Sequence, residues 1–111
     1  MTAAVRAARG EVVLVDLYDS RGGEIRKMRP CVVLSPDEFN QFGPLRIVAP
    51  MTTGAHPYRS RVPCKFDDKS GHVVLDQLRS IDVRRVHGRL GMLSAATVRQ
   101  ALAVLSEMFA E

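Results

Sequence analysis

The sequence predicts a mainly β fold: a small antiparallel β-barrel packed against one C-terminal helix. Short runs rich in β-branched and other apolar residues recur along the chain, separated by loops containing glycine, proline or charged residues. A long helical pattern stands out near the C-terminal end. Strands in series closed by a single helix argue against alternating βαβ units, in which helices would separate the strands.

The composition is that of one ordinary folded domain. The chain has 111 residues, of which 46% are hydrophobic and 25% charged, enough for a single modest core. Its apolar runs fall far short of the ~20 residues that a membrane-spanning helix needs, and its start lacks a signal-type apolar core. We therefore expect a cytoplasmic protein without a membrane segment, with a flexible tail over residues 1–8 and one domain over residues 9–111.

The first part of the chain predicts two strands and a short helix. Residues 11–18 are rich in β-branched residues and predict a strand buried along its length. A charged loop with two adjacent glycines, residues 19–28, leads into a second strand at residues 30–34. Ser35 then offers an N-cap, and Pro36 a first helical residue, for the short helix.

The middle of the chain predicts three further strands. Residues 45–51 form the first. Residues 61–66 alternate apolar and polar side chains, and Pro63 indicates an edge strand because proline cannot donate a backbone hydrogen bond. Residues 67–71 have the composition of a turn, and residues 72–78 predict a buried strand that ends in a carboxylate and an amide.

The C-terminal region predicts the one long helix. Ser94 is suited to be its N-cap, and the helix should run to residue 110. Its apolar side chains recur at helical spacing and predict a stripe that packs on the sheet: Val98, Ala101, Leu102, Leu105, Met108 and Phe109. Before this helix, residues 83–90 predict only a short turn or strand.

The basic residues make a polyanionic partner plausible. The formal net charge is +4, and the basic side chains gather in three stretches of the chain. These are Arg21, Arg26, Lys27 and Arg29; Arg59 and Arg61; and Arg79, Arg84, Arg85 and Arg89. Folding could bring the stretches onto one face that follows a phosphate backbone, and a solvated surface is the alternative for each stretch taken alone.

Neither the histidines nor the cysteines indicate a metal or cofactor site. His56, His72 and His87 are scattered singly and lack the spacing of zinc ligands. Cys31 and Cys64 lie in apolar strand-like runs, so both are expected to be free thiols, and their number and spacing demand no disulfide. We expect no bound metal and no cofactor.

Arg29 stands where the charged loop meets the second strand. Pro30 disfavours the α conformation for the residue before it, so Arg29 is biased toward extended backbone. Its guanidinium could then face a site at the mouth of the strand. The alternative is a solvated arginine paired with Glu24 or a neighbouring aspartate.

An ordered series of short motifs runs through nearly the whole chain. It comprises Arg9-Gly10-Glu11-Val12, Glu24 with Arg29-Pro30-Cys31-Val32-Val33, Ala49-Pro50-Met51-Thr52, Asp76-Gln77-Leu78-Arg79-Ser80-Ile81-Asp82 and Arg89-Leu90-Gly91. In this order the motifs resemble the MazF/PemK family of toxin endoribonucleases from type II toxin–antitoxin systems. The resemblance covers residues 9–109, and the series as a whole carries it.

The resemblance implies a fold, an activity and partners. The implied fold is an SH3-like barrel of the MazF/PemK/CcdB type with a C-terminal helix, in a homodimer whose interface helps to form an RNA channel. The implied activity is metal-independent, sequence-specific cleavage of single-stranded RNA that inhibits translation and growth. In it a ribose 2′-OH attacks the adjacent phosphorus, leaving a 2′,3′-cyclic phosphate and a 5′-OH. An antitoxin with an acidic tail is the implied inhibitor.

The resemblance also implies which residues act. Arg29 falls on the Arg-Pro arginine of the family and would stabilise negative charge at phosphorus. Thr52 falls on a threonine or serine that would hydrogen-bond a phosphate oxygen or the 2′-OH. Glu24 and Asp76 both match acidic positions, so either could be the general base. The residues expected to bind RNA are Arg26, Lys27, Thr53, Gln77, Arg79 and Tyr58.

Each of these residues also has a simpler structural interpretation. The hydroxyl of Thr52 could cap a turn at the end of its strand. Asp76 could form a structural ion pair with Arg79, and Glu24 could be a solvated loop carboxylate.

Two departures from the family pattern keep other functions open. Some members have a histidine where this chain has Gly23 and an arginine where it has Val74, so a mechanism that depends on those groups cannot be transferred. One alternative is therefore an inactive barrel that binds RNA or an antitoxin. The other is a non-enzymatic toxin of the same fold that binds a protein, as gyrase poisons do.

Overall fold

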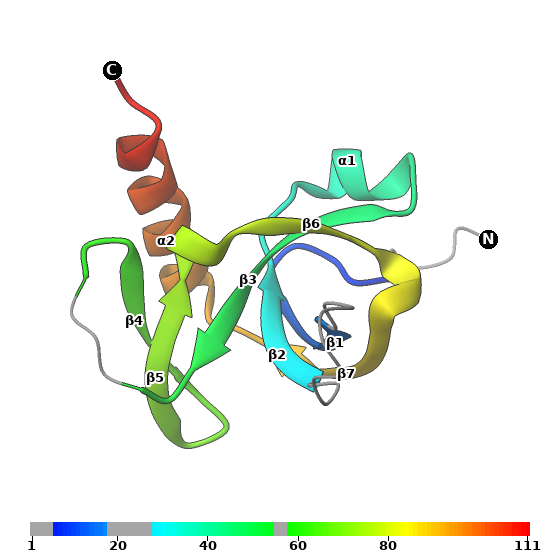
Figure 1. The fold of residues 1–111 in the computed structure, drawn as a ribbon, viewed down its shortest axis with the longest axis horizontal. Helices are drawn as coiled ribbons and strands as arrows, with labels where there is room; N and C mark the ends of the chain where they lie inside the picture. Colours follow the sequence, from blue (N-terminus) through cyan, green and yellow to red (C-terminus); the bar gives the residue numbers. More distant parts are fainter. Residues whose placement is uncertain (1–5, 18–27, 55–57) are drawn as a thin grey trace, which may run out of the picture.

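The computed structural model describes residues 6–17, 28–54 and 58–111. Its elements in chain order are β1 (Glu11–Asp16), β2 (Met28–Val33), α1 (Asp37–Gln41), β3 (Leu45–Thr52), β4 (Arg61–Phe66), β5 (Lys69–Val74), the 3₁₀ helix η1 (Leu75–Gln77), β6 (Arg79–Asp82), the 3₁₀ helix η2 (Val83–Arg85), β7 (Val86–Met92) and α2 (Ala95–Met108) (Figure 1). The prediction of a mainly β fold with a C-terminal helix is confirmed. Within these residues, no helix is long and apolar enough to cross a membrane.

All the strand pairs are antiparallel. The order across the sheet is β4-β5-β3-β2-β1-β7, and β6 pairs with a separate stretch of β3. In the described part of the chain the pairing does not join β4 to β7, so the expected barrel is left open at this seam. Pro63 lies in β4, as expected for an edge strand. At the seam between β4 and β7, side-chain packing replaces backbone hydrogen bonds. The Phe66 ring of β4 lies so close to Gly91 of β7 that a Cβ added to Gly91 would be 3.3 Å from the ring.

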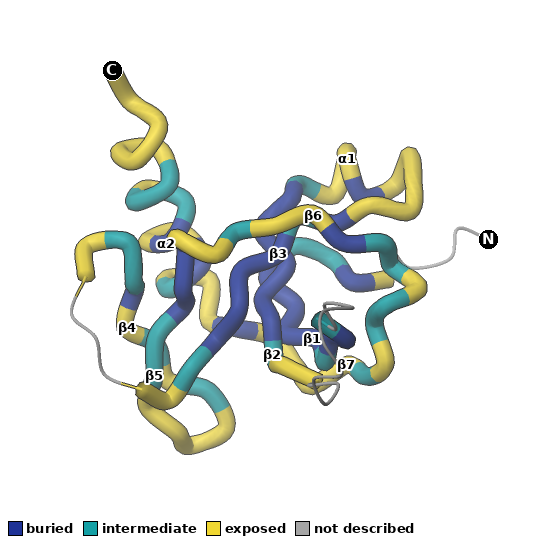
Figure 2. The backbone as a smooth tube through the Cα atoms, viewed as in Figure 1, coloured by how far each residue is buried: buried dark blue, intermediate teal, exposed yellow. Residues whose placement is uncertain are grey.

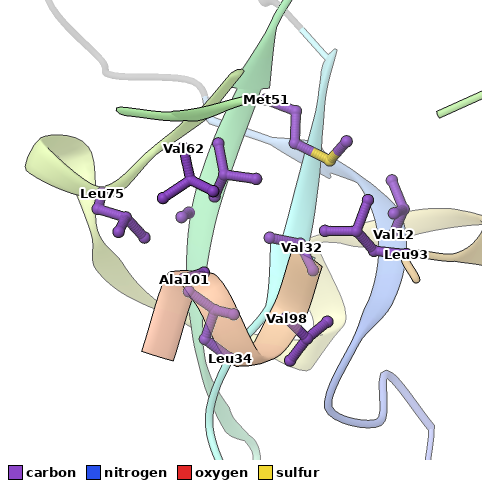
Figure 3. Packing of buried hydrophobic residues seen from close by; sticks show 11 residues of the cluster. Val12, Val32, Leu34, Met51, Val62, Leu75, Leu93, Val98 and Ala101 are labelled. Carbon is purple, nitrogen blue, oxygen red and sulfur yellow. The ribbon is translucent and has the colours of Figure 1, made fainter. Parts of the chain in front are cut away.

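The buried hydrophobic side chains form two clusters. Most residues of the central strands β1 and β3 are buried (Figure 2). Alternation along β3 divides the two clusters, since Ala49 belongs to one cluster and Val48 to the other. The first cluster lies under α2, from which Val98 and Ala101 project into it (Figure 3). The second cluster is built from β1, β2, β3 and β6. The strands that carry Arg29 and Thr52 are therefore held from both faces.

Helix α2 begins as predicted and leaves the sheet at its end. The Oγ of Ser94 accepts a 3.2 Å hydrogen bond from the Thr97 amide, which confirms the N-cap. Val98 and Ala101 are buried. Phe109, expected in the packed stripe, is 76% exposed because the end of the helix projects beyond the strands (Figure 1).

The start of the short helix differs from its prediction. Helix α1 has Pro36 at its N-cap position, so Ser35 precedes the cap. The buried Ser35 Oγ instead donates to Asn40 Oδ1 at 2.6 Å and accepts from the Ile47 amide at 3.0 Å. Its hydroxyl ties the helix to β3 because both its hydrogen and its lone pair find partners there.

The strand expected at residues 72–78 begins and ends earlier. Asp67 and Asp68 alone form the turn, both with positive φ, and β5 starts at Lys69. The expected strand end, including Asp76, is the 3₁₀ helix η1. A strand that we did not predict, β6, follows it.

Residues 6–8, grouped with the tail by sequence, contact the domain. Ala7 is 1% exposed and belongs to the second cluster. The Arg46 guanidinium is buried and donates hydrogen bonds to the carbonyls of Arg6 and Ala7. Residues 1–5 and most of the expected loop at 19–28 lie outside the described residues.

Candidate functional site

The register of β2 and β3 brings Arg29 and Thr52 to the same level of neighbouring strands. Cys31 pairs with Pro50 in the antiparallel ladder. Two residues further along each strand stand Arg29 and Thr52, which therefore project from the same face as that pair. Continuing that register by two residues places Arg29 and Thr52, 23 positions apart in the sequence, at the same level at one end of the sheet, where Arg29 is exposed.

The hydroxyl of Thr52 has a defined orientation. Its Oγ1 accepts a 3.1 Å hydrogen bond from the Gly54 amide. This is the turn-capping contact that the sequence offered as the simpler interpretation. Because a hydroxyl both donates and accepts, the Thr52 hydrogen remains available for a ligand oxygen, so capping and ligand binding are compatible.

Strand β5 lies unusually close to Thr52. A Cβ built on Gly71 would be 2.0 Å from the Thr52 carbonyl oxygen, so only glycine fits at this position. His72, the next residue, pairs directly with Thr52 in the ladder. Sequence reasoning missed both residues, because their importance depends on which strand lies beside β3.

A cavity of about 290 Å³ adjoins Thr52 and Thr53. It occupies the seam between the β4–β5 hairpin and β7, and its lining combines apolar side chains with a polar rim. The lining residues are Pro30, Met51, Thr52, Thr53, Cys64, Phe66, Asp67, Lys69, Ser70, Gly71 and Leu90. Its size is near the lower end of ligand pockets, roughly 300–1,000 Å³.

Asp76 belongs to a different local cluster. Its Oδ1 accepts hydrogen bonds from Ser60 Oγ at 3.0 Å and Arg61 Nε at 3.4 Å, so its ion-pair partner is Arg61 instead of Arg79. Desolvation alone would raise the pKa of Asp76. The hydrogen bonds from Arg61 and Ser60 and the charge of Arg61 together outweigh desolvation, so the pKa of Asp76 is lowered. The Arg61 guanidinium also lies 5.1 Å from the centre of the Tyr58 ring.

Two arginines share the electrostatic environment of Cys31. Burial raises the pKa of its thiol to about 12, and the positive charges of Arg79 and Arg29 oppose that increase. Arg79 is exposed on β6, where it pairs with Val48 of β3. The positive charges of two exposed arginines, on β2 and β6, thus act on the same buried thiol.

The remaining predicted site residues are dispersed. Gln77 is exposed in η1, and Thr53 is exposed beside the cavity. Glu24, Arg26 and Lys27 lie outside the described residues. Among the residues described, no group of histidine, cysteine and acidic side chains could hold a metal ion. Cys31 and Cys64 are free thiols, as predicted.

Comparisons with known proteins agree on one family. Residues 8–109 match the family model described as PemK-like, MazF-like toxin of type II toxin–antitoxin system. The chain is 32% identical over 94 residues to Endoribonuclease MazF of Staphylococcus epidermidis, covering 78% of this chain and 77% of that protein. It is 37% identical over 101 residues to Endoribonuclease toxin ChpB of Escherichia coli K12, covering 85% and 86%.

A solved structure gives the same result in three dimensions. The MazE–MazF crystal structure (Form II) from Deinococcus radiodurans superposes with a TM-score of 0.81 and 27% sequence identity. The match covers 96% of this chain and 96% of that one.

Proposed function

Because this chain belongs to the PemK-like, MazF-like family of toxins of type II toxin–antitoxin systems, we propose that it cleaves single-stranded RNA without a metal ion. The observation that carries the proposal is the placement of Arg29 and Thr52 at one level of β2 and β3, beside a cavity. The names of the curated relatives, both endoribonucleases, favour an enzyme over a protein-binding toxin or an inactive barrel.

The proposed reaction is an internal transfer at phosphorus. The ribose 2′-oxygen forms a bond to phosphorus as the bond to the 5′-oxygen breaks. The 2′-OH gives up its proton to a base, the departing 5′-oxygen gains one, and the products are a 2′,3′-cyclic phosphate and a 5′-OH. Negative charge grows on the non-bridging oxygens, and the fork of the Arg29 guanidinium is suited to bind them in that state.

Thr52 assists Arg29 in this proposal. Its Oγ1 accepts from Gly54, so its hydrogen points elsewhere and can be donated to a phosphate oxygen or to the 2′-oxygen. Hydrogen bonds from fixed donors stabilise developing charge without reorganisation during the reaction. Thr52 therefore acts as a donor in the site.

We take Glu24, which the family resemblance suggests, as the base. Asp76 is the alternative, but its Oδ1 is engaged by Ser60 and Arg61 and its pKa is lowered, which makes it a weaker proton acceptor. We assign Asp76 the task of holding Arg61 beside the Tyr58 ring.

The RNA itself is held by exposed basic and polar side chains. Phosphates would contact Arg79 and, from the first long loop, Arg26 and Lys27, whereas Thr53 and Gln77 would hydrogen-bond bases or sugars. Tyr58, 61% exposed, offers a ring for stacking. One unstacked base would enter the cavity beside Thr52.

The proposed partners follow from the same family. A MazE–MazF complex is known for the Deinococcus radiodurans relative, which supports a cognate antitoxin here, with an acidic tail that competes with RNA for the basic residues. We propose a homodimer as the active form, working in the cytoplasm where its RNA substrates are.

The test is cleavage of a long single-stranded RNA in excess EDTA, with fragment ends mapped. We expect discrete cuts with 5′-OH ends from the wild type, and loss of cutting in Arg29→Ala. Arg99→Ala is the matched control, since Arg99 is an exposed arginine on α2. Growth arrest that persists in Arg29→Ala would favour a protein-binding toxin, and a wild type that binds RNA without cutting it would indicate an inactive barrel.

A further inference from the structure

His72 is connected to Thr52 through Gly54. The two side chains share a face because Thr52 and His72 are directly paired between β3 and β5. The Nδ1 atom of His72 lies 3.0 Å from the Gly54 carbonyl oxygen. The Gly54 amide in turn donates to Thr52 Oγ1 at 3.1 Å. One glycine is thus held at its carbonyl by the imidazole and at its amide by the threonine.

We propose that His72 is a positioning residue, which orients the Thr52 hydroxyl by restraining Gly54; this inference rests on the RNA cleavage proposed above. Glycine has the widest backbone freedom of any residue, so a glycine that carries a functional hydrogen bond needs an external restraint. The imidazole supplies that restraint on the carbonyl side. With it, the amide stays aimed at Thr52 Oγ1 and the Thr52 hydrogen stays aimed at the substrate.

The chemistry of the contact defines what His72 must supply. A carbonyl oxygen can only accept a hydrogen bond, so Nδ1 of His72 must carry the hydrogen. An asparagine side chain has an amide donor at a similar distance from the backbone as Nδ1, whereas leucine has a similar shape and no donor. The pair of substitutions therefore separates the hydrogen bond from packing.

The close approach of β5 supports the same function. At Gly71 the β5 backbone lies so near the Thr52 carbonyl that a Cβ would be 2.0 Å from the oxygen. The end of β3 is therefore braced by β5 at its backbone, beside the contact of His72 with Gly54.

The experiment compares single-turnover cleavage by wild type, His72→Leu and His72→Asn, with His87→Leu as the control at an exposed histidine of β7. Losing one positioning hydrogen bond should lower the rate constant about tenfold in His72→Leu with little change in KM. His72→Asn should recover most of that loss, and His87→Leu should match the wild type. In a Thr52→Val background, His72→Leu should cause no further decrease, because its effect passes through Thr52.

A second measurement does not depend on catalysis. Exchange of the Gly54 amide hydrogen with solvent should become faster in His72→Leu and stay near the wild-type rate in His72→Asn. An unchanged exchange rate, equal activities of the Leu and Asn variants, or a full tenfold effect in the Thr52→Val background would each overturn the inference. A wild type that fails to cut RNA would overturn the proposed function instead, and with it the catalytic purpose of the contact.

Discussion

Replacing Gly71 by alanine tests how closely the site depends on the approach of β5 to Thr52. The added Cβ would lie 2.0 Å from the Thr52 carbonyl oxygen, 2.9 Å from its carbonyl carbon and 3.2 Å from Thr53 Cα. All three atoms belong to the backbone, so no side-chain rotation relieves the clash. The backbones of β5 and of the end of β3 must separate by about 1 Å to restore a 3.0 Å contact.

That displacement has two measurable consequences. Overpacking of this kind costs roughly 1–3 kcal/mol of the free energy of unfolding. A shift of about 1 Å in a reacting group can lower a rate about 100-fold, so Gly71→Ala should lose about that much cleavage activity while remaining folded. The assays are thermal unfolding and single-turnover cleavage of the RNA mapped with the wild type.

Gly43→Ala is the matched control for this prediction. A Cβ at Gly43 would meet nothing within 4 Å, so the same substitution there should leave activity unchanged. If Gly71→Ala cut RNA as fast as Gly43→Ala, the position of Thr52 would not matter to the reaction, and the assignment of Thr52 to the site would have to be abandoned.

Three further predictions concern single groups. Arg61→Ala should raise the pKa of Asp76, which carboxyl NMR titration can measure. Because the pKa of Asp76 is lower in the folded than in the unfolded protein, ionised Asp76 stabilises the fold above its unfolded-state pKa. That stabilisation is lost as the pH falls through its folded-state pKa. An unmoved titration would exclude Arg61 as a cause. Cys31, with a pKa of about 12, should resist alkylation in the native protein at neutral pH and react after denaturation, which mass spectrometry can follow; rapid native labelling would contradict its burial. Ser94→Ala should cost about 1 kcal/mol of the free energy of unfolding in denaturant titrations, and no change would show that the cap does not matter.

The parts of the fold that sequence could predict are those governed by local pattern. The β-branched run of β1, the proline of β4 and the cap and apolar spacing of α2 each depend on residues close together in the chain. β6 was missed because its four residues, Arg79–Asp82, have no strand pattern of their own and become a strand only by pairing with β3. Ser35 was misassigned because a distant strand competed for its hydroxyl.

In the candidate site, too, local motifs identified some residues, whereas contacts between distant parts of the chain determine the rest. Arg29 and Thr52 could be proposed from the Arg-Pro and strand-end motifs, but their placement at one level follows only from extending the β2–β3 register. Asp76 was predicted as a candidate base, with a structural ion pair to Arg79 as the alternative, but its ion-pair partner is Arg61 on the neighbouring hairpin. His72 looked like an isolated histidine because no local motif records that Gly54 lies opposite it.

The pairing of β1 with β7 also determines when the molecule can be completed during synthesis. Glu11 of β1 is paired with Met92 in the ladder and forms an ion pair with Arg89, 78 residues later in the chain. A growing chain emerges from the ribosome N-terminus first, so β1 has only its partner β2 until the residues of β7 have been made. For a family of toxins, this connectivity delays the finished sheet until β7 has left the ribosome.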